Sequence, residues 1–245
     1  MKNALIIGAT SAIAQSLADQ LAQSGASLFL AGRSAAKLDL IATDLKVRHK
    51  VKVETAAIDF DDFTRHAPLI DLAAERLGGL DLAVICHGSL PDQKACERDY
   101  LLTEAEFRIN CLSAISFLGH LANRFEERRA GCLVAISSVA GDRGRQSNYV
   151  YGAAKAALSA FLEGLRNRLH PKGVRVLTVK PGFVDTPMTA HLKKGLLMVS
   201  PEVVARDIMR AVESGKYELY TPWFWRWIML IIKLIPERIF IRLKL

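Results

Sequence analysis

The sequence of 245 residues lacks several features that would assign it to other classes of protein. Its four cysteines form no CxxC pair and show no metal-ligand spacing, and two of them lie in apolar runs typical of buried strands. No stretch rich in proline, glycine or serine divides the chain, and it contains no internal repeat. We therefore expect one domain with reduced, buried cysteines and no metal site.

A long apolar run is also missing from the start of the chain. The apolar segment that follows Met1 ends at Gly8 and is too short for a signal peptide, so we expect a cytoplasmic protein. The formal net charge of +8 would attract nucleic acid, anionic lipid or a phosphorylated ligand by the same screened force. Charge alone does not choose among them, and the motifs of the chain lead us to expect a phosphorylated ligand and no nucleic acid.

What the sequence does contain is a regular alternation of short apolar runs with segments of helical period. Hydrophobic residues make up 51% of the chain, which is enough for a large core. The apolar runs lie at residues 4–7, 28–31, 51–57, 80–86, 132–137 and 174–179. This rhythm predicts the α/β class, with a doubly wound parallel sheet of the Rossmann-like type in a single domain.

Boundary signals place three of the helices between these runs. They begin after Ser34 (35–48), at Thr103 with Glu106 as its capping-box partner (103–129), and after Ser200 and Pro201 (202–214). From 182 to 199 the pattern loses periodicity, which is typical of a functional lid or of a disordered segment.

Gly8 closes the first apolar run and is followed by an amphipathic helical segment, the position where a nucleotide phosphate meets a helix N-terminus. The residues of this turn that we assign to cofactor binding are Gly8, Thr10, Ser11, Ala12 and Ile13. Only the first of three expected glycines is present, and Ala12 restricts how closely the backbone can approach a pyrophosphate. By itself the turn fits a dinucleotide site or an ordinary connection between a strand and a helix.

Arg33 stands at the end of the second run, where an NAD-specific site usually presents an acidic side chain to the ribose 2′-hydroxyl. Its planar cationic fork suits a 2′-phosphate instead, which favours NADP(H) over a solvated surface arginine. Asp59, just beyond the third run, either accepts a hydrogen bond from the adenine amino group or caps the next helix.

The strongest chemical signal lies in the second half of the chain. Ser138 follows an apolar run, and Tyr151 and Lys155 are spaced one helical turn apart. This spacing puts both side chains on one helix face, where we expect the ammonium to lower the pKa of the phenol by stabilising its ionised form. A tyrosine tuned in this way is a usable acid or base near neutral pH.

Over roughly residues 1–215 the ordered set of motifs resembles the short-chain dehydrogenase/reductase family. The set comprises the glycine turn at Gly8, Asn110, Ser138, Tyr151, Lys155 and the segment 181–186. The resemblance implies an oxidoreductase that moves a hydride between NADP(H) and a carbonyl or alcohol carbon. It further implies that Tyr151 exchanges a proton with the substrate oxygen while Ser138 holds that oxygen.

The resemblance also implies the remaining roles in the site. Lys155 would hold the nicotinamide ribose hydroxyls and keep the tyrosine acidic, and Asn110 would position a water in a proton relay. In the segment that begins with Pro181 and Gly182, Val184 would contact the nicotinamide carboxamide and Thr186 the diphosphate.

One stretch departs from the family pattern. Ile85, Cys86, His87 and Gly88 stand where many members have Asn-Asn-Ala-Gly, so an asparagine that usually tethers neighbouring strands is missing. This stretch is similar to reductases that act on polyprenyl-phosphate-linked keto-sugars, such as the decaprenylphosphoryl keto-pentose reductases. His87 and Gly88 follow the carboxyl end of a strand, so they are assigned to the cofactor mouth, although a lone histidine is more often structural.

Within the C-terminal segment 222–245, the run 223–235 is apolar nearly all round, ends before Pro236 and is shorter than the bilayer span of about 20 residues. Arg226 and Lys233 lie seven residues apart beside three tryptophans, a pattern typical of a membrane interface. The segment equally fits an oligomer interface or a cover for the substrate pocket. We therefore divide the chain into a cofactor-binding and catalytic domain (1–221) and this tail, and we expect a homo-oligomer.

Three functions fit these observations. The first is an NADPH-dependent ketoreductase for a lipid-linked or hydrophobic substrate such as a polyprenyl-phosphate keto-sugar, whose phosphate could meet His191, Lys193 and Lys194 unless these form a solvated face. The second is a reductase of 3-oxoacyl groups or other small ketones. The third, a non-catalytic NADP(H)-binding sensor, has no chemical need for the serine, tyrosine and lysine.

Overall fold

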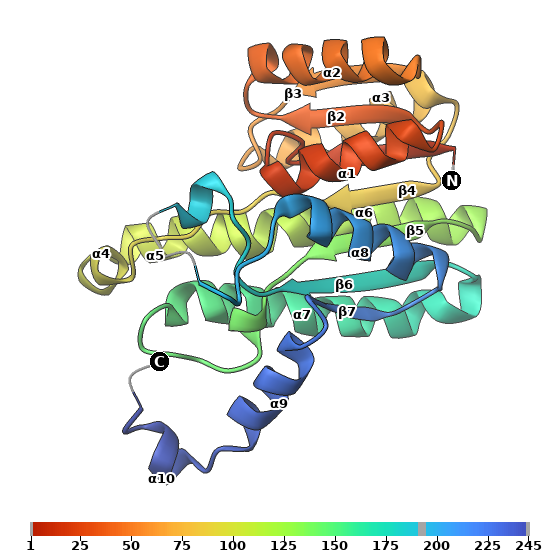
Figure 1. The fold of residues 1–245 in the computed structure, drawn as a ribbon. Helices are drawn as coiled ribbons and strands as arrows, with labels where there is room; N and C mark the ends of the chain where they lie inside the picture. Colours follow the sequence, from red (N-terminus) through yellow and green to blue (C-terminus); the bar gives the residue numbers. More distant parts are fainter. Residues whose placement is uncertain (1, 191–194, 244–245) are drawn as a thin grey trace.

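The computed structural model describes residues 2–190 and 195–243, and its centre is a seven-stranded parallel sheet (Figure 1). The strands follow the order β3-β2-β1-β4-β5-β6-β7. They are β1 (Asn3–Ile7), β2 (Ser27–Gly32), β3 (Val53–Ala57), β4 (Leu82–Ile85), β5 (Cys132–Ile136), β6 (Arg175–Pro181) and β7 (Glu218–Thr221). The predicted parallel α/β sheet is confirmed, and six of the strands coincide with the six apolar runs.

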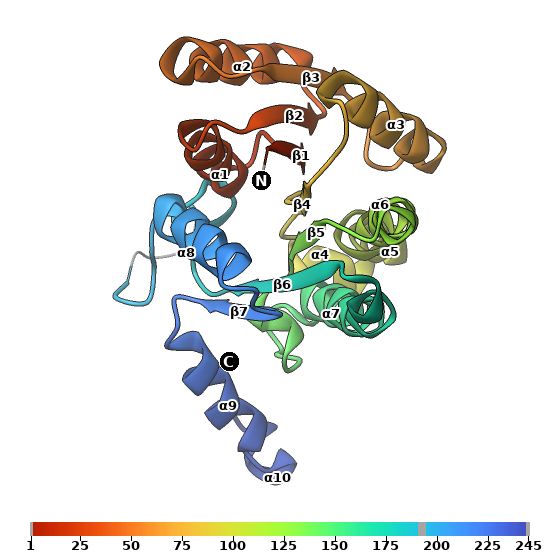
Figure 2. The same ribbon diagram turned by 90° about the vertical axis from the view of Figure 1, so that its right-hand side faces the viewer.

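Helices cover both faces of the sheet (Figure 2). One face carries α1 (Ala12–Gln23), α2 (Ala35–His49) and α8 (Pro201–Glu213); the other carries α3 (His66–Leu77), α6 (Ser113–Arg128) and α7 (Tyr149–Leu169). Smaller elements are η1 (Phe63–Arg65), α4 (Gln93–Arg98), α5 (Tyr100–Phe107), η2 (Arg108–Leu112), η3 (Val139–Gly141), η4 (His170–Lys172) and η5 (Pro187–Thr189).

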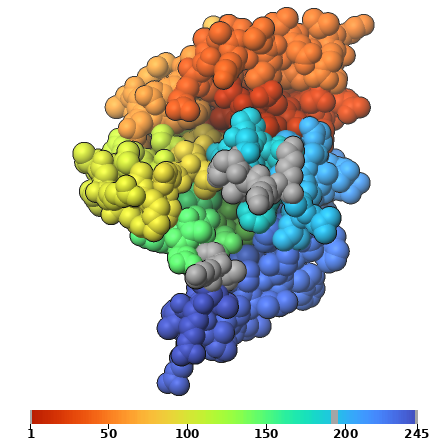
Figure 3. All heavy atoms as spheres, turned by 60° about the vertical axis from the view of Figure 1, so that its left-hand side comes forward, coloured from red at the N-terminus to blue at the C-terminus, as the bar shows by residue number. Residues whose placement is uncertain are grey.

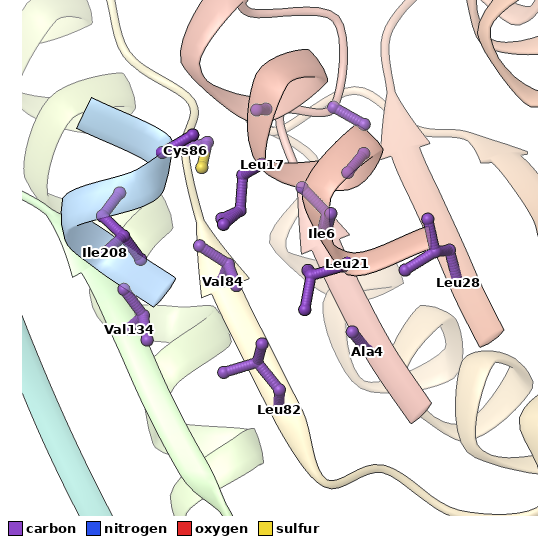
Figure 4. Close-up of a cluster of buried hydrophobic side chains, with 14 of the residues drawn as sticks. Ala4, Ile6, Leu17, Leu21, Leu28, Leu82, Val84, Cys86, Val134 and Ile208 are labelled. Atoms are coloured by element: carbon purple, nitrogen blue, oxygen red, sulfur yellow. The ribbon is translucent and has the colours of Figure 1, made fainter. Parts of the chain in front are cut away.

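The alternation of side chains along each strand builds two separate cores. In β1, Ala4 and Ile6 join the cluster under α1 and α8, whereas Leu5 and Ile7 join the cluster under α3, α6 and α7. Figure 4 shows the first cluster, where Leu17 of α1 lies over the face of the sheet that carries Ile6 and Val84. Because both faces are covered, the inner strands are apolar at most positions, which explains why they are recognisable as apolar runs.

The strand order reverses between β1 and its neighbour β4. In an open parallel sheet, ligands bind beyond the carboxyl ends of the strands at such a reversal. Gly8 follows β1 and His87 follows β4, so both lie at this point. A side chain at position 8 would clash with the second segment, because a Cβ there would lie 2.4 Å from His87 N, and its φ of +83° also favours glycine.

The helix predicted over 103–129 consists of α5, a π-helical turn η2 and α6. The predicted capping box of Thr103 and Glu106 is wrong. Asp99 caps α5, with its Oδ1 accepting from Leu101 N at 2.8 Å, and Thr103 Oγ1 donates to Cys96 O at 3.1 Å. The cap is therefore Asp99, four residues before Thr103, which was the expected cap. Glu106 takes no part in capping this helix.

All four cysteines are free and buried, as expected. Among the described residues, no cluster of three or more histidine, cysteine or acidic side chains is arranged to hold a metal ion. Within the aperiodic segment, Val184 and Val199 form an isolated bridge that joins its two ends. His191, Lys193 and Lys194 lie outside the described residues.

The C-terminal helices α9 (Trp225–Leu234) and α10 (Glu237–Phe240) extend away from the β7 edge of the sheet (Figures 1 and 3). Trp225 and Met229 are buried against Val139, and this contact fixes one face of α9 to the domain. None of the helices in the described ranges is long and apolar enough to cross a membrane. The division into residues 1–221 and 222–245 stays a prediction.

Candidate active site

Ser138 lies where the chain leaves β5 and enters the short helix η3. Its backbone is extended and its Oγ accepts from Ala140 N at 3.1 Å, which caps η3. A Cβ on Gly141 would lie 2.8 Å from Ala156 N, and a Cβ on Gly152 would lie 2.8 Å from Ala140 O. The two glycines therefore let η3 pack directly on the backbone of α7, which brings Ser138 beside the first turn of that helix.

Tyr151 and Lys155 occupy this first part of α7. The Lys155 Nζ atom lies 5.7 Å from the centroid of the Tyr151 ring and donates to Ile136 O at 3.1 Å. The backbone of Lys155 is anchored as well, because its carbonyl accepts from Ser137 Oγ at 3.1 Å and from Ser159 Oγ at 2.9 Å. Ser138, Tyr151 and Lys155 thus meet at the carboxyl end of β5.

The electrostatics of this pair differ from the sequence-based expectation. Burial raises the pKa of Tyr151 to about 12; a hydrogen bond with Ser138 opposes the rise, and the charge of Glu106 adds to it. Burial also lowers the pKa of Lys155 to about 8. The pKa of the phenol is therefore raised and not lowered as expected, because burial dominates its shift. The phenol stays protonated at neutral pH.

Asn110 lies on the π-helical turn η2, a local distortion that often marks functional sites. It is fully buried, and its Oδ1 accepts from Ser89 N at 3.2 Å. A Cβ on Gly88 would lie 2.8 Å from Asn110 Oδ1 and 3.4 Å from Lys155 Nζ. Gly88 therefore sits between the amide and the ammonium, so the structure brings Asn110 into the same cluster.

The glycine turn forms a cradle at the start of α1. Ser11 caps this helix, with its Oγ accepting from Ala14 N at 3.3 Å. Thr10, Ser11, Ala12 and Ile13 are all half-buried, so the N-terminus of α1 borders solvent. A helix start of this kind, beside a glycine at the strand reversal, fits a pyrophosphate.

Arg33 is exposed after β2, and its charge acts on His87 across the cleft. Asp59 is exposed after β3, and its Oδ1 accepts from Asp61 N at 3.0 Å. The residue that caps the next helical turn is Asp62, whose Oδ1 accepts from Thr64 N at 3.2 Å. The capping alternative for Asp59 is therefore wrong, and adenine binding at Asp59 stays a prediction.

His87 is buried as a neutral aromatic ring. It stacks on Phe60 with ring centroids 4.5 Å apart and meets Phe117 edge-on at 5.9 Å. Burial, with the nearby Lys155 charge, lowers its pKa to about 3. Neither ring nitrogen has a hydrogen-bond partner in the described part of the chain. This packing supports the structural alternative for the His87 side chain.

The segment after β6 packs against the C-terminal helix. Gly182 N donates to Thr221 O at 3.0 Å, and a Cβ on Gly182 would lie 1.9 Å from Trp225 Nε1. Val184 is buried, whereas Thr186 is half-buried and begins η5. Pro181 ends β6, so these residues border the carboxyl edge of the sheet, and their contacts with the cofactor stay a prediction.

A hollow of about 530 Å³ lies between the loop after β4 and the loop before α7. Its lining mixes polar and apolar surface and consists of Leu90, Pro91, Asp92, Gln93, Lys94, Gln146 and Ser147. Gln93 Oε1 accepts from Val150 N at 3.1 Å, which joins the wall of the hollow to the residue before Tyr151. The sequence did not identify this hollow, because its two walls are about fifty residues apart along the chain.

Comparisons with known proteins agree with this geometry. The model of the short chain dehydrogenase family matches residues 2–196, and the chain therefore belongs to that family. An uncharacterized oxidoreductase of Mycobacterium tuberculosis is 38% identical over 239 residues, which cover 98% of this chain and 96% of the relative. An uncharacterized oxidoreductase of Myxococcus xanthus is 32% identical, covering 91% of this chain and 88% of that protein.

Solved structures with the same fold include a short-chain dehydrogenase from Sphingobium yanoikuyae in complex with NADPH. It superposes with a TM-score of 0.84 at 22% identity, covering 94% of this chain and 92% of its own. A variant of actinorhodin polyketide ketoreductase with NADPH has a TM-score of 0.80 at 21% identity, with coverages of 90% and 95%. At such identities the likeness establishes the fold.

Proposed function

We propose that this protein is an NADPH-dependent reductase that converts a ketone to an alcohol, with Tyr151 as the proton donor. The observation that carries the proposal is the cluster of half-buried Ser138 and Tyr151 with buried Lys155 and Asn110 at the carboxyl edge of the sheet. A phenol that stays protonated at neutral pH, beside a lysine with a lowered pKa, is suited to give a proton to a developing alkoxide.

The residues around the strand reversal fit a dinucleotide with a 2′-phosphate. The backbone from Gly8 to Ile13 and the start of α1 would hold the pyrophosphate, and Arg33 would hold the 2′-phosphate. Asp59 would face the adenine, and Gly88, Pro181, Gly182, Val184 and Thr186 would border the nicotinamide half. When bound, the cofactor supplies the hydride to the substrate carbon.

The protein's own part in the reaction is the movement of one proton. Ser138 holds the substrate oxygen by a hydrogen bond that strengthens as negative charge develops there. Tyr151 gives its proton to that oxygen, and Lys155 stabilises the tyrosinate that remains. Asn110 is placed to hold a water that returns a proton to this cluster from solvent.

The direct test replaces Tyr151 by phenylalanine, which removes only the proton donor. NADPH oxidation is followed with a panel of 3-oxoacyl thioesters, cyclic ketones and keto-sugars, and NADPH binding is followed by its fluorescence. We expect a loss of kcat of roughly 10²- to 10⁴-fold with cofactor binding retained. Unchanged turnover in the variant would refute the role of Tyr151, and NADPH binding without turnover by the wild type on any ketone would favour the sensor.

Cofactor choice has its own test at Arg33. Arg33→Ala should raise the KM for NADPH by roughly 10- to 100-fold, because a charge-assisted contact to the 2′-phosphate is lost. The KM for NADH should stay near its wild-type value. Equal changes for both cofactors would remove Arg33 from the 2′-phosphate site.

For the substrate, we propose a hydrophobic or lipid-linked ketone, with a polyprenyl-phosphate keto-sugar as the most specific version. The hollow is joined through Gln93 to the residue before Tyr151, and its polar side chains Asp92, Gln93 and Lys94 support a substrate that carries hydroxyl groups. A 3-oxoacyl substrate offers few hydroxyls to these side chains, so the ketone panel distinguishes the two substrate classes.

We further propose that α9 and α10 dock on an anionic membrane surface. Trp227, Ile231 and Leu234 lie at i, i+4 and i+7 on α9, and all three are exposed. This face lies away from Trp225 and Met229, which attach the helix to the domain.

Charge supports a lipid partner over another protein surface. Arg226, Lys233, Arg238 and Arg242 are all exposed around the apolar face, and the carboxylate of Glu237 is paired with Arg143 at 2.9 Å. A tryptophan-bearing apolar stripe with flanking cations is the pattern of an interfacial helix. The helices also project from the domain, where a flat surface can reach them (Figure 3).

Vesicle flotation tests this docking. Deletion of the tail is unsuitable, because Trp225 is 3% exposed and fills the space beside Gly182. The double variant Trp227→Ser/Ile231→Ser should lose flotation with phosphatidylcholine vesicles that contain phosphatidylglycerol. Leu40→Ser/Val47→Ser, which alters two exposed apolar side chains on α2, should float like the wild type.

Equal flotation of both double variants, or no flotation of the wild type, would end the membrane proposal. Dissociation of an oligomer by Trp227→Ser/Ile231→Ser would assign the same face to a second copy of the chain.

For the homo-oligomer itself, we propose the apolar side chains exposed on α5 and η2 as the contact: Tyr100, Leu101, Leu102 and Leu112. Light scattering of Tyr100→Ser/Leu101→Ser checks this, and an unchanged molecular mass would contradict it.

A further inference from the structure

Glu106 lies one helical turn before Asn110, and its carboxylate is tied into the active-site cluster. Glu106 Oε2 accepts from Asn110 Nδ2 at 2.8 Å and from Ser89 Oγ at 2.5 Å. Asn110 Nδ2 also donates to Ser89 Oγ at 3.1 Å, and Ser89 N donates to Asn110 Oδ1 at 3.2 Å. The three residues form a closed ring of hydrogen bonds, which determines the direction in which the Asn110 amide points.

This ring stands where the sequence departs from the family pattern. His87, in the stretch that lacks the usual asparagine, uses its side chain for aromatic packing and anchors no neighbouring strand by a hydrogen bond among the described residues. Ser89 and Glu106 instead hold the first residues after β4 to η2. The short contact from the Ser89 hydroxyl to the Glu106 carboxylate is typical of a charge-assisted hydrogen bond.

Glu106 also supplies a negative charge that acts on Tyr151. The other ionisable groups that act on this cluster are Lys155 on α7, Cys111 on η2, and Cys86 and His87 after β4. Burial raises the pKa of Cys86 to about 12, raises that of Cys111 and lowers that of His87 to about 3. The two thiols and the imidazole are therefore uncharged near neutral pH, which leaves Lys155 and Glu106 as the charges of the cluster.

We propose that Glu106 is a positioning residue that fixes the amide of Asn110 and holds Tyr151 in its proton-donating form. In reduction, the O–H bond of Tyr151 breaks and its proton goes to the substrate oxygen as the hydride reaches the adjacent carbon. In oxidation, the tyrosinate must accept a proton instead. The carboxylate charge of Glu106, which acts on the phenol, disfavours the tyrosinate and so favours the form of the enzyme that carries out reduction. The preference for reduction depends on the proposed reductase activity, whereas the effect of the charge on the phenol does not.

The test measures the ionisation of Tyr151 without any substrate. The protein is labelled with 3-fluorotyrosine, whose phenol ionises at lower pH than that of tyrosine, and each tyrosine is followed by ¹⁹F NMR. The signal of Tyr151 is assigned by its loss in Tyr151→Phe. In Glu106→Gln, which keeps the size of the side chain and removes its charge, the midpoint of Tyr151 should fall by about one pH unit.

Glu104→Gln is the matched control. Glu104 is exposed on the same helix two residues earlier, so this variant removes an equal charge that points elsewhere. Its Tyr151 midpoint should equal that of the wild type. An unchanged midpoint in Glu106→Gln, or an equal fall in both variants, would overturn the proposal.

A second variant covers the case in which Glu106→Gln does not fold. Glu106→Asp keeps the charge but withdraws it by one methylene, so the Tyr151 midpoint should fall by a fraction of a pH unit from the wild-type value, and no change would contradict the proposal. Where a ketone supports turnover, the ratio of kcat for oxidation to kcat for reduction, each measured at saturation and at the same pH, should rise in Glu106→Gln. A protein without turnover would refute the reductase while leaving the NMR result intact.

Discussion

Two lysines are buried at the same edge of the sheet in the described part of the chain, and they differ in whether carboxylates pair with them. Lys180 of β6 pairs with Asp142 at 2.8 Å and with Glu218 at 2.6 Å, and Tyr220 donates to Asp142 at 2.6 Å. Lys155 of α7 donates to one backbone carbonyl and has no carboxylate partner among the described residues.

The pKa values of the two ammonium groups shift in opposite directions. Burial lowers the pKa of Lys155 to about 8. Burial acts on Lys180 in the same sense, but its hydrogen bonds with Asp142 and Glu218 outweigh this and raise its pKa above the usual range. A buried charge that is paired with carboxylates is suited to a structural role. A buried charge without such partners destabilises the folded state and is available for chemistry.

The largest expected effect comes from the unpaired lysine. Lys155→Met should lower kcat/KM for ketone reduction by roughly 10²- to 10⁴-fold, because the tyrosinate loses its neighbouring charge. Its free energy of unfolding should match or exceed that of the wild type, since an unpaired buried cation is removed. Urea unfolding and NADPH oxidation measure the two effects, and a strongly destabilised variant would show that Lys155 is structural.

The paired lysine should behave in the reverse way. Asp142→Ala leaves Lys180 buried with only the half-exposed Glu218 as its partner, and should lower the free energy of unfolding by roughly 3–5 kcal/mol. Glu218→Gln is the control and should cost about 1 kcal/mol or less, because its carboxylate is partly solvated. Equal effects of the two variants in urea unfolding would show that the pair does not differ from a surface ion pair.

The smallest effect is a dependence of stability on pH. Between pH 8 and 10.5, folded Lys155 has released its proton while the unfolded chain still holds it. The unfolded state then binds more protons, so the wild type should gain stability relative to Lys155→Met as pH rises, by up to about 1.4 kcal/mol per pH unit. Parallel curves for the two proteins across this range would contradict the lowered pKa.

The fold was largely predictable from the sequence because burial on both faces makes each inner strand a continuous apolar run. Strand β7 was missed, since Glu218 to Thr221 is a short edge strand with a polar residue at each end. The start of α5 was placed wrongly because Thr103 and Glu106 match a capping pattern that Asp99 fulfils from an earlier position. A local sequence pattern indicates that a helix start has a capping side chain, but it does not identify which residue caps the helix.

The sequence predicted which side chains lie together at this edge of the sheet, but it did not predict the directions of their pKa shifts. The spacing of Tyr151 and Lys155 placed them on one helix face, yet the direction of the pKa shift depends on how deeply the fold buries them. The sequence also did not predict ion pairs and hydrogen bonds between residues that are distant along the chain. Asp142 and Lys180 are 38 residues apart, and Arg143 reaches Ile235 O at 2.7 Å across 92 residues.

The most direct measurement is a crystal structure of the protein with NADPH bound. We expect the 2′-phosphate to contact Arg33 and the pyrophosphate to contact the turn from Gly8 to Ile13. We also expect Lys155 Nζ to contact the nicotinamide ribose. The Tyr151 hydroxyl and Ser138 Oγ should then both reach one point above the nicotinamide ring. A nicotinamide bound away from this cluster, or a Tyr151 hydroxyl turned from it, would contradict the assignment of Tyr151 as the proton donor.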